Sequence, residues 1–120
     1  MANILLAEDD PTMRQFLSAA LERAGHKVTA CKDGLEALKT AEEGGDYDLL
    51  LADIVMPGID GIELSQRVTD ANDRIKVVFI TGFAGVTMGE QQENRPQARV
   101  LSKPFHLKEI VDQVEDVLAH

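Results

Sequence analysis

Hydrophobic and polar positions follow two alternating patterns along the chain. Five short segments are rich in apolar residues and are bounded by turn or polar residues, which is typical of strands buried in a sheet. Between them, apolar residues recur three or four positions apart, as they do on one face of a helix. The predicted strands are Ile4–Ala7, Lys27–Cys31, Asp48–Asp53, Val77–Ile80 and Val100–Leu101. The pattern therefore predicts strands that alternate with helices.

Two of the predicted helices begin at residues that can cap a helix, and two end at glycine. The starting residues are Asp10 with Pro11 and Asp60 with Glu63, and the stopping glycines are Gly25 and Gly44–Gly45. A turn at Asp33–Gly34 is predicted to precede the second helix. The apolar positions predicted to face the core are Met13, Phe16, Leu17, Ala20, Leu21, Ala24, Leu35, Leu38, Ala41, Leu64, Val68, Ala71, Leu107, Ile110, Val111, Val114, Val117 and Leu118. The segment from Phe83 to Arg99 has poor periodicity. There we expect a short or mobile fourth helix, or a loop.

Buried strands joined by helical crossovers form a parallel sheet that is covered on both faces. The sequence thus predicts an α/β fold with a doubly wound parallel sheet, in a single domain over residues 1–120. In such a sheet, ligands bind at the carboxyl ends of the strands, where the strand order reverses. The residues that follow each strand are therefore the first candidates for chemistry.

Composition narrows the classes of partner. The 120 residues are 44% hydrophobic but only 4% aromatic, so we expect an aliphatic core. A formal net charge of −9 argues against nucleic acid and anionic membrane surfaces as partners, because clustered cations are needed to bind them.

Cys31 is the only cysteine, which excludes a disulfide within the chain. The sequence has no apolar stretch long enough to span a bilayer and no signal peptide, so we expect a cytoplasmic protein.

Five polar side chains come at the carboxyl ends of the predicted strands. Glu8 and Asp9 follow the first strand, and Asp53 ends the third. Thr81 follows the fourth and Lys103 follows the fifth. Since parallel strands end at one edge of the sheet, we expect these side chains to lie close together. Three neighbouring carboxylates repel one another, and Mg²⁺, which prefers oxygen ligands and binds substrate phosphates, would offset that repulsion.

The expected cluster has the parts needed for phosphoryl transfer. A carboxylate can act as the nucleophile and form an aspartyl phosphate. Asp53 is the central candidate because it ends the middle strand, whereas Glu8 and Asp9 are better placed to hold the metal. Lys103 and Thr81 can hold the other oxygens of the transferring group.

Four sequence blocks resemble the receiver domain of bacterial two-component systems. They are Ile4–Asp10 (ILLAEDD), Asp53–Pro57 (DIVMP), Ile80–Gly82 (ITG) and Lys103–Phe105 (KPF). The resemblance covers essentially the whole chain and implies a flavodoxin-like (βα)5 fold with strand order 2-1-3-4-5. It implies that Asp53 accepts a phosphoryl group, which Thr81 and Lys103 contact. The Mg²⁺ ligands that it implies are Asp9, Asp53 and the carbonyl of Val55 directly, with Glu8 acting through water.

The resemblance also implies partners. A histidine kinase or a histidine phosphotransfer protein would supply the phosphoryl group, and we expect no output domain. The fourth helix, the fifth strand and the last helix would bind a protein target. Val100 stands where receivers usually carry an aromatic residue that rotates inward during signalling, so the usual aromatic readout is not expected here.

Three blocks resemble more closely the CpdR-type single-domain response regulators. These blocks are Leu49–Pro57, Val78–Ala84 and Leu101–Pro104, and the polar fourth-helix segment adds to the likeness. Such proteins are alphaproteobacterial cell-cycle regulators that, when unphosphorylated, aid substrate delivery to a ClpXP-type protease. The resemblance therefore implies a role in regulated proteolysis.

Two other functions stay open at this point. The domain could pass on or drain phosphoryl groups within a phosphorelay, without a dedicated target. It could instead be a Mg²⁺-dependent phosphohydrolase, but enzymes of the haloacid-dehalogenase type carry a second acid where this chain has Val55. Because Val55 and Phe83 cannot hydrogen-bond a water, we expect the chain to hydrolyse its own aspartyl phosphate slowly and to have no other enzymatic activity.

Overall fold

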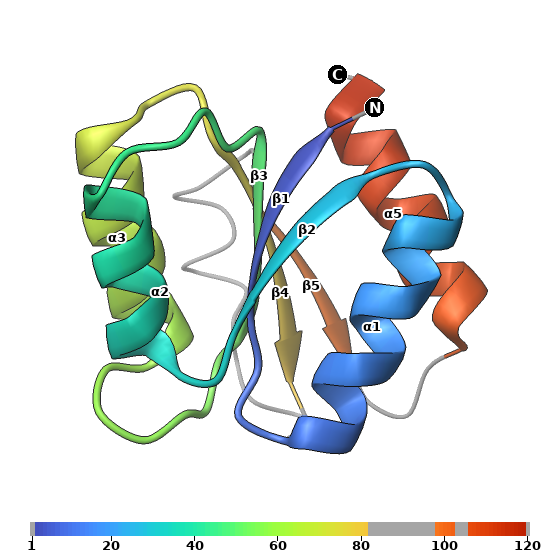
Figure 1. Ribbon diagram of the computed structural model, residues 1–120, viewed down its shortest axis with the longest axis horizontal. Helices are drawn as coiled ribbons and strands as arrows, with labels where there is room; N and C mark the ends of the chain where they lie inside the picture. The colour runs from blue at the N-terminus through green and yellow to red at the C-terminus, as the bar shows by residue number, and fades with distance from the viewer. Residues whose placement is uncertain (1, 82–97, 103–105, 120) are drawn as a thin grey trace.

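The computed structural model describes residues 2–81, 98–102 and 106–119. In these residues, five parallel strands form one sheet in the order β2-β1-β3-β4-β5, and four helices flank it (Figure 1). The strands are β1 (Asn3–Ala7), β2 (Lys27–Cys31), β3 (Leu49–Asp53), β4 (Lys76–Thr81) and β5 (Ala98–Ser102). The helices are α1 (Pro11–Arg23), α2 (Gly34–Glu42), α3 (Gly61–Ala71) and α5 (Leu107–Ala119). The predicted doubly wound, flavodoxin-like fold is confirmed.

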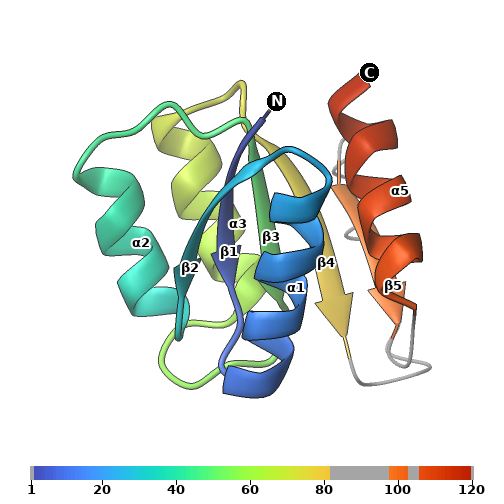
Figure 2. The ribbon, with the colours of Figure 1, turned by 45° about the vertical axis from the view of Figure 1, so that its right-hand side comes forward.

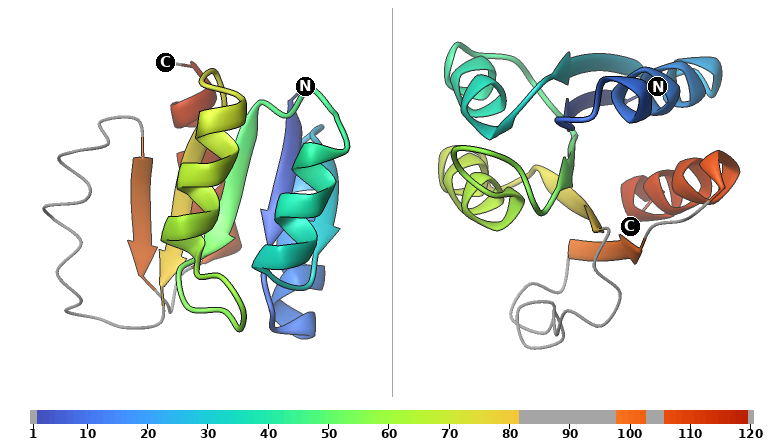
Figure 3. Two further views of the ribbon diagram at one scale, coloured as in Figure 1. Left: turned by 90° about the vertical axis from the view of Figure 1, so that its left-hand side faces the viewer. Right: turned by 90° about the horizontal axis from the view of Figure 1, so that it is seen from below.

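The helices cover the two faces of the sheet in pairs. Helices α1 and α5 lie on one face, and α2 and α3 lie on the other (Figures 1 and 2). All strands point the same way, so their carboxyl ends share one edge of the sheet, opposite the edge where the chain begins and ends (Figure 3). The strand order reverses between β1 and β3, because the chain first adds β2 outside β1 and then crosses back. The carboxyl ends of β1 and β3 therefore mark the predicted place for a ligand.

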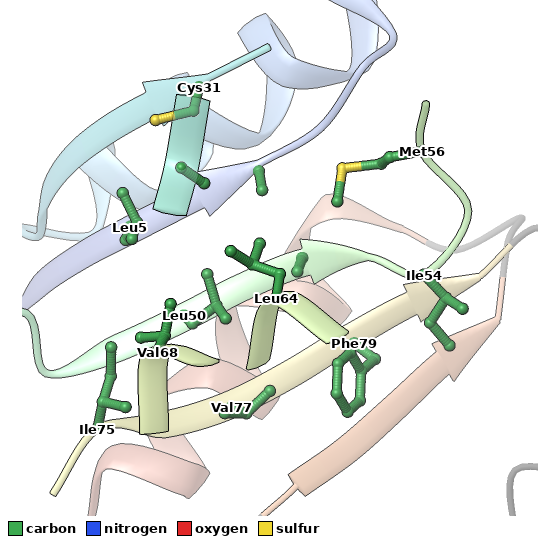
Figure 4. Packing of buried hydrophobic residues seen from close by; sticks show 13 residues of the cluster. Leu5, Cys31, Leu50, Ile54, Met56, Leu64, Val68, Ile75, Val77 and Phe79 are labelled. Carbon is green, nitrogen blue, oxygen red and sulfur yellow. The ribbon is translucent and has the colours of Figure 1, made fainter. Parts of the chain in front are cut away.

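Successive residues of a strand point to opposite faces, so each face of the sheet has its own core. Leu5 and Leu50 belong to the cluster under α2 and α3, whereas Leu6 and Leu51 belong to the cluster under α1 and α5. Phe79 belongs to the cluster under α2 and α3 (Figure 4). It is the one aromatic side chain among the buried members of the two clusters in the described residues. The aliphatic core expected from the composition is confirmed for this part of the chain.

Aspartates cap three of the helices: the caps at Asp10 and Asp60 were predicted, and Asp33, which was predicted to form a turn, caps α2 as well. The carboxylate of Asp10 accepts hydrogen bonds from the backbone N–H groups of Thr12 and Met13, at 2.9 and 3.2 Å. Asp33 and Asp60 each accept one at 2.8 Å from the backbone N–H three positions later. These caps fix where each helix starts after its strand.

No helix in the described part of the chain is both long enough and apolar enough to cross a membrane.

The fifth strand is longer than predicted. It runs from Ala98 to Ser102, because its backbone pairs with β4 along its whole length, from Val77–Ala98 to Thr81–Ser102. Backbone pairing does not depend on apolar side chains, so the hydrophobic pattern shows only part of this strand. The predicted fourth helix falls on residues 83–99, of which 83–97 lie outside the described residues.

Two large side chains that were predicted to face the core are exposed instead. Phe16 is 52% exposed and Leu35 is 56% exposed. The fully buried Leu17 and Leu21 define the core side of α1, and helical geometry places Phe16 roughly 120° around the axis from that direction. Leu35 lies similarly far from the buried side of α2. The other exposed positions from the predicted stripes are Ala24 and Ala71, at helix ends.

Candidate functional site

Three carboxylates meet at the carboxyl edge of the sheet, where β1 and β3 end. Carboxylate oxygens of Glu8, Asp9 and Asp53 all lie within 4.8 Å of one another. Glu8 has no exposed surface and Asp53 is 5% exposed, whereas Asp9 is exposed. The structure thus brings together the three acidic residues that the strand pattern placed at this edge.

Glu8, in the turn from β1 to α1, makes hydrogen bonds through its backbone N–H, its carboxylate and its carbonyl. Its backbone N–H donates to the carbonyl of Cys31 at 3.1 Å, which extends the pairing of β1 with β2. Its carboxylate accepts a hydrogen bond from the backbone N–H of Asp10 at 3.1 Å. Its carbonyl accepts one from the guanidinium of Arg14 at 2.9 Å. Glu8 is therefore held through backbone and side chain, and the exposed Asp9 follows it directly.

Asp53 is the last residue of β3, in the middle of the sheet. Its Oδ1 accepts a hydrogen bond from the backbone N–H of Val55 at 3.2 Å. The next residue, Ile54, donates its N–H to the carbonyl of Ile80 on β4 at 2.9 Å. On the other side, α3 begins at Gly61, so close that a Cβ there would overlap the Asp53 carbonyl oxygen. The backbone at Asp53 is therefore held by β4 and by α3.

Of the other residues predicted to act at this site, the structure describes Thr81 and Val55. Thr81 is the last residue of β4, is 3% exposed, and lies one residue beyond Ile80, the register partner of Asp53. Val55 lies two residues after Asp53, and it is 50% exposed. Lys103 lies outside the described residues, as does Phe83, so their predicted roles stay predictions.

The donor set of this cluster suits a hard divalent cation. Carboxylates offer oxygen ligands, which Mg²⁺ and Ca²⁺ prefer to nitrogen or sulfur. Like charges this close, two of them on buried side chains, repel one another more strongly than they would in water. A cation bound by Asp9 and Asp53 would offset this repulsion, so the residues present fit the Mg²⁺ that was expected.

Sequence interpretation missed two residues that shape this site. Arg14 contacts the carbonyl of Glu8 from six positions later in the chain, and no local motif signals such a contact. Gly61 occupies the first position of α3, against the end of β3. A glycine inside a helix lowers helix propensity, which often has a packing reason, and that was the one available signal.

Cys31 ends β2 at the same edge of the sheet, and its thiol is buried. Burial raises the pKa of Cys31 above its ordinary value, and the carboxylates of Glu36 and Asp33 add to this effect. A contact from the thiol to Thr40 Oγ1, at 3.7 Å, opposes the rise in pKa. A thiol with a raised pKa is a poor nucleophile at neutral pH, so Cys31 is not a reactive group of this site.

This chain is similar to known proteins both in sequence and in fold. A family model described as the response regulator receiver domain matches residues 4–115. The response regulator receiver protein CpdR of Brucella abortus is 48% identical over 118 residues, which are 98% of this chain and 98% of that protein. The solved receiver domain of the hybrid histidine kinase CckA has a TM-score of 0.82 and 32% identity, covering 97% of this chain and 98% of that one. Chemotaxis protein CheY4 of Vibrio cholerae has a TM-score of 0.87 and 25% identity, covering 98% of both chains.

Proposed function

Because the chain belongs to the response regulator receiver domain family, we propose that it is a single-domain response regulator phosphorylated on Asp53. The observation that carries this proposal is the buried Asp53 carboxylate at the strand-order reversal, with Glu8 and Asp9 beside it. Residues 1–120 would act as one receiver domain. The match to the Brucella protein over 98% of both chains supports this.

The phosphoryl donor would be a histidine kinase or a histidine phosphotransfer protein, as is usual for receivers. An Asp53 carboxylate oxygen attacks the phosphorus in line, and the bond from phosphorus to the donor imidazole breaks as the new one forms. The proton that the leaving imidazole takes up comes from solvent. Thr81, buried at the end of the neighbouring strand, would hydrogen-bond a phosphoryl oxygen, and Lys103 would neutralise another.

Magnesium is the cofactor that this chemistry requires. Asp9, Asp53 and the carbonyl of Val55 would hold the ion directly, and Glu8 would hold it through a water. When bound, Mg²⁺ offsets negative charge on the group being transferred. The cluster of three carboxylates within 4.8 Å supports this assignment, because it supplies the oxygen ligands that Mg²⁺ prefers.

We do not expect this chain to be an enzyme that acts on separate substrates. A phosphohydrolase of the haloacid-dehalogenase type would need a second acid two residues after the nucleophile. That position holds Val55, an apolar side chain that is 50% exposed and cannot transfer a proton. The receiver would instead hydrolyse its own aspartyl phosphate, and slowly.

The output surface would be formed by the fourth-helix segment, β5 and α5. Arg99 links β5 to α5, since its guanidinium contacts Gln113 at 2.8 Å and Asp116 at 2.6 Å on α5. Val100, partly buried against the core, takes the place of the usual aromatic residue. By its likeness to CpdR-type regulators, the chain would act in the cytoplasm and control substrate delivery to a ClpXP-type protease.

Phosphorylation is tested with acetyl phosphate and Mg²⁺, followed by intact mass measurement. We expect the wild type to gain one phosphoryl group and Asp53→Asn to gain none. Asp70→Asn, which removes an exposed carboxylate on α3, is the matched control and should be phosphorylated like the wild type. Undiminished labelling of Asp53→Asn would overturn the assignment.

The downstream role is tested separately, by binding of the purified ClpX-type unfoldase to the domain. If the unphosphorylated form is the active one, Asp53→Ala should bind with or without acetyl phosphate, and the wild type should lose binding once phosphorylated. Binding by neither form would contradict the proteolysis role and favour a phosphorelay shuttle or phosphate sink.

A further inference from the structure

Arg14, in the first turns of α1, contacts the segment that carries two of the three carboxylates. Its guanidinium Nη1 donates a hydrogen bond of 2.9 Å to the backbone carbonyl of Glu8. Its own backbone N–H donates to the carbonyl of Asp10 at 2.8 Å. The side chain is half-buried, so the contact is partly shielded from solvent. Arg14 therefore bridges the two residues that flank Asp9.

Two further hydrogen bonds, both donated by backbone N–H groups, also hold Glu8 and Asp10. The N–H of Glu8 reaches Cys31 on β2, and the N–H of Asp10 reaches the Glu8 carboxylate. The carbonyl of Glu8 belongs to the peptide that leads into Asp9. A charged donor on that carbonyl sets the orientation of this peptide, and with it the starting point of the Asp9 side chain.

We propose that Arg14 is a positioning residue of the metal site, which holds the peptide between Glu8 and Asp9 so that Asp9 and Asp53 can share one Mg²⁺. This inference rests on the proposed function, because it assigns Mg²⁺ to the carboxylate cluster. Guanidinium suits the task, because its planar, permanently charged donors keep a defined geometry. Residues of this kind typically change metal affinity without touching the ion.

Charge and position make opposite predictions for the loss of Arg14. A positive charge near the cluster disfavours a cation, so if Arg14 acted by its charge alone, its removal would strengthen Mg²⁺ binding. If Arg14 positions Asp9, its removal weakens binding despite the charge that is lost. The sign of the change in affinity therefore separates the two explanations.

The experiment is a titration of MgCl₂, followed by the backbone amide NMR signals of Asp53 and Val55, without any phosphoryl donor. We expect Arg14→Met to raise the dissociation constant for Mg²⁺ by about tenfold. This is the low end of the loss of metal affinity that is typical when a residue that orients a metal ligand is replaced. Arg23→Met removes the same charge from the far end of the same helix, and should leave the constant nearly unchanged. The proposal would be overturned if the dissociation constant of Arg14→Met for Mg²⁺ were equal to, or lower than, that of Arg23→Met.

Arg14→Lys provides a second measurement. Unlike Arg14→Met, it keeps the positive charge and a hydrogen-bond donor, on a side chain that is one atom shorter than arginine. Positioning predicts that the lysine variant binds Mg²⁺ more tightly than Arg14→Met, whereas charge alone predicts the reverse order. If Arg14→Met does not fold, weaker binding by Arg14→Lys than by the wild type supports the proposal, and equal binding overturns it. A wild type that neither binds Mg²⁺ nor takes up phosphoryl from acetyl phosphate would overturn the proposed function as well.

Discussion

Gly61, the first residue of α3, lies directly against the backbone of Asp53, the last residue of β3. A Cβ on Gly61 would overlap the carbonyl oxygen of Asp53 and would lie 3.0 Å from the Cα of Ile54. These neighbours are backbone atoms, so they cannot give way as the end of a flexible side chain can. The position of α3 and the position of Asp53 are therefore coupled.

Gly61→Ala should lower the free energy of unfolding by about 2 kcal/mol, as is typical when a methyl group is forced into a packed site. It should also weaken Mg²⁺ binding, because relief of the overlap displaces Asp53. Urea unfolding measures the first effect, and a magnesium titration of the folded protein measures the second.

Gly34→Ala is the matched control for this prediction. A Cβ on Gly34, the first residue of α2, would lie 2.5 Å from the carbonyl oxygen of Ile59, and its three nearest atoms all belong to Ile59. This variant should lose stability but keep most of its Mg²⁺ affinity. If the two variants bind Mg²⁺ equally well, Asp53 is not displaced by the alanine at position 61.

Asp9→Asn should stabilise the protein when Mg²⁺ is absent. It removes one of three carboxylates that lie within 4.8 Å of one another. The repulsion between two like charges at about this distance next to water costs about 1 kcal/mol, and the variant is relieved of it. The gain should shrink at high salt, because exposed charges are screened. Mg²⁺ should raise the Tm of the wild type but not of the variant, since only a folded state that binds the ion is stabilised by it. A drop in stability without Mg²⁺ would mean that Asp9 has a structural role.

Val55→Asn should accelerate the loss of the phosphoryl group from Asp53 by roughly tenfold, because an amide can orient the attacking water and valine cannot. The half-exposed side chain leaves room for the change. The measurement is the decay of the phosphorylated protein with Mg²⁺ after acetyl phosphate has been removed.

Val55→Ala separates orientation of the water from simple access to the site. It opens the same space without adding a hydrogen-bonding group, so its decay should stay close to that of the wild type. Decay within seconds in the wild type, or equal decay in Val55→Asn, would show that this side chain does not control hydrolysis.

Cys31 should make stability fall at alkaline pH. Burial raises the pKa of its thiol in the folded protein, so the folded state keeps a proton that the unfolded chain releases above about pH 8.5. The stabilisation is complete below that pH and is lost as the pH rises toward the folded pKa. Urea unfolding from pH 7 to pH 10 should show this loss in the wild type and a smaller loss in Cys31→Ala. Identical pH profiles would show that the thiol does not contribute.

Local pattern was sufficient to predict most of the fold. Apolar runs located the five strands, and the capping aspartates located the starts of α1 and α3, because strand burial and helix capping both depend on neighbouring residues. The gathering of Glu8, Asp9 and Asp53 also followed, since parallel strands end at one edge. The roles assigned to Lys103 and Phe83 stay predictions, because both residues lie outside the described part of the chain.

Other features were decided only by the tertiary structure. Phe16 was predicted to face the core because it falls at helical spacing with the other apolar residues of α1, but the direction of the core, set by where α1 packs on the sheet, leaves it exposed. The contact of Arg14 with Glu8 depends on how β1 turns into α1, and that of Gly61 with Asp53 depends on how β3 leads into α3. Periodicity states which side of an element is apolar. It does not state how closely two backbones approach, because that distance results from packing the whole sheet and its helices at once.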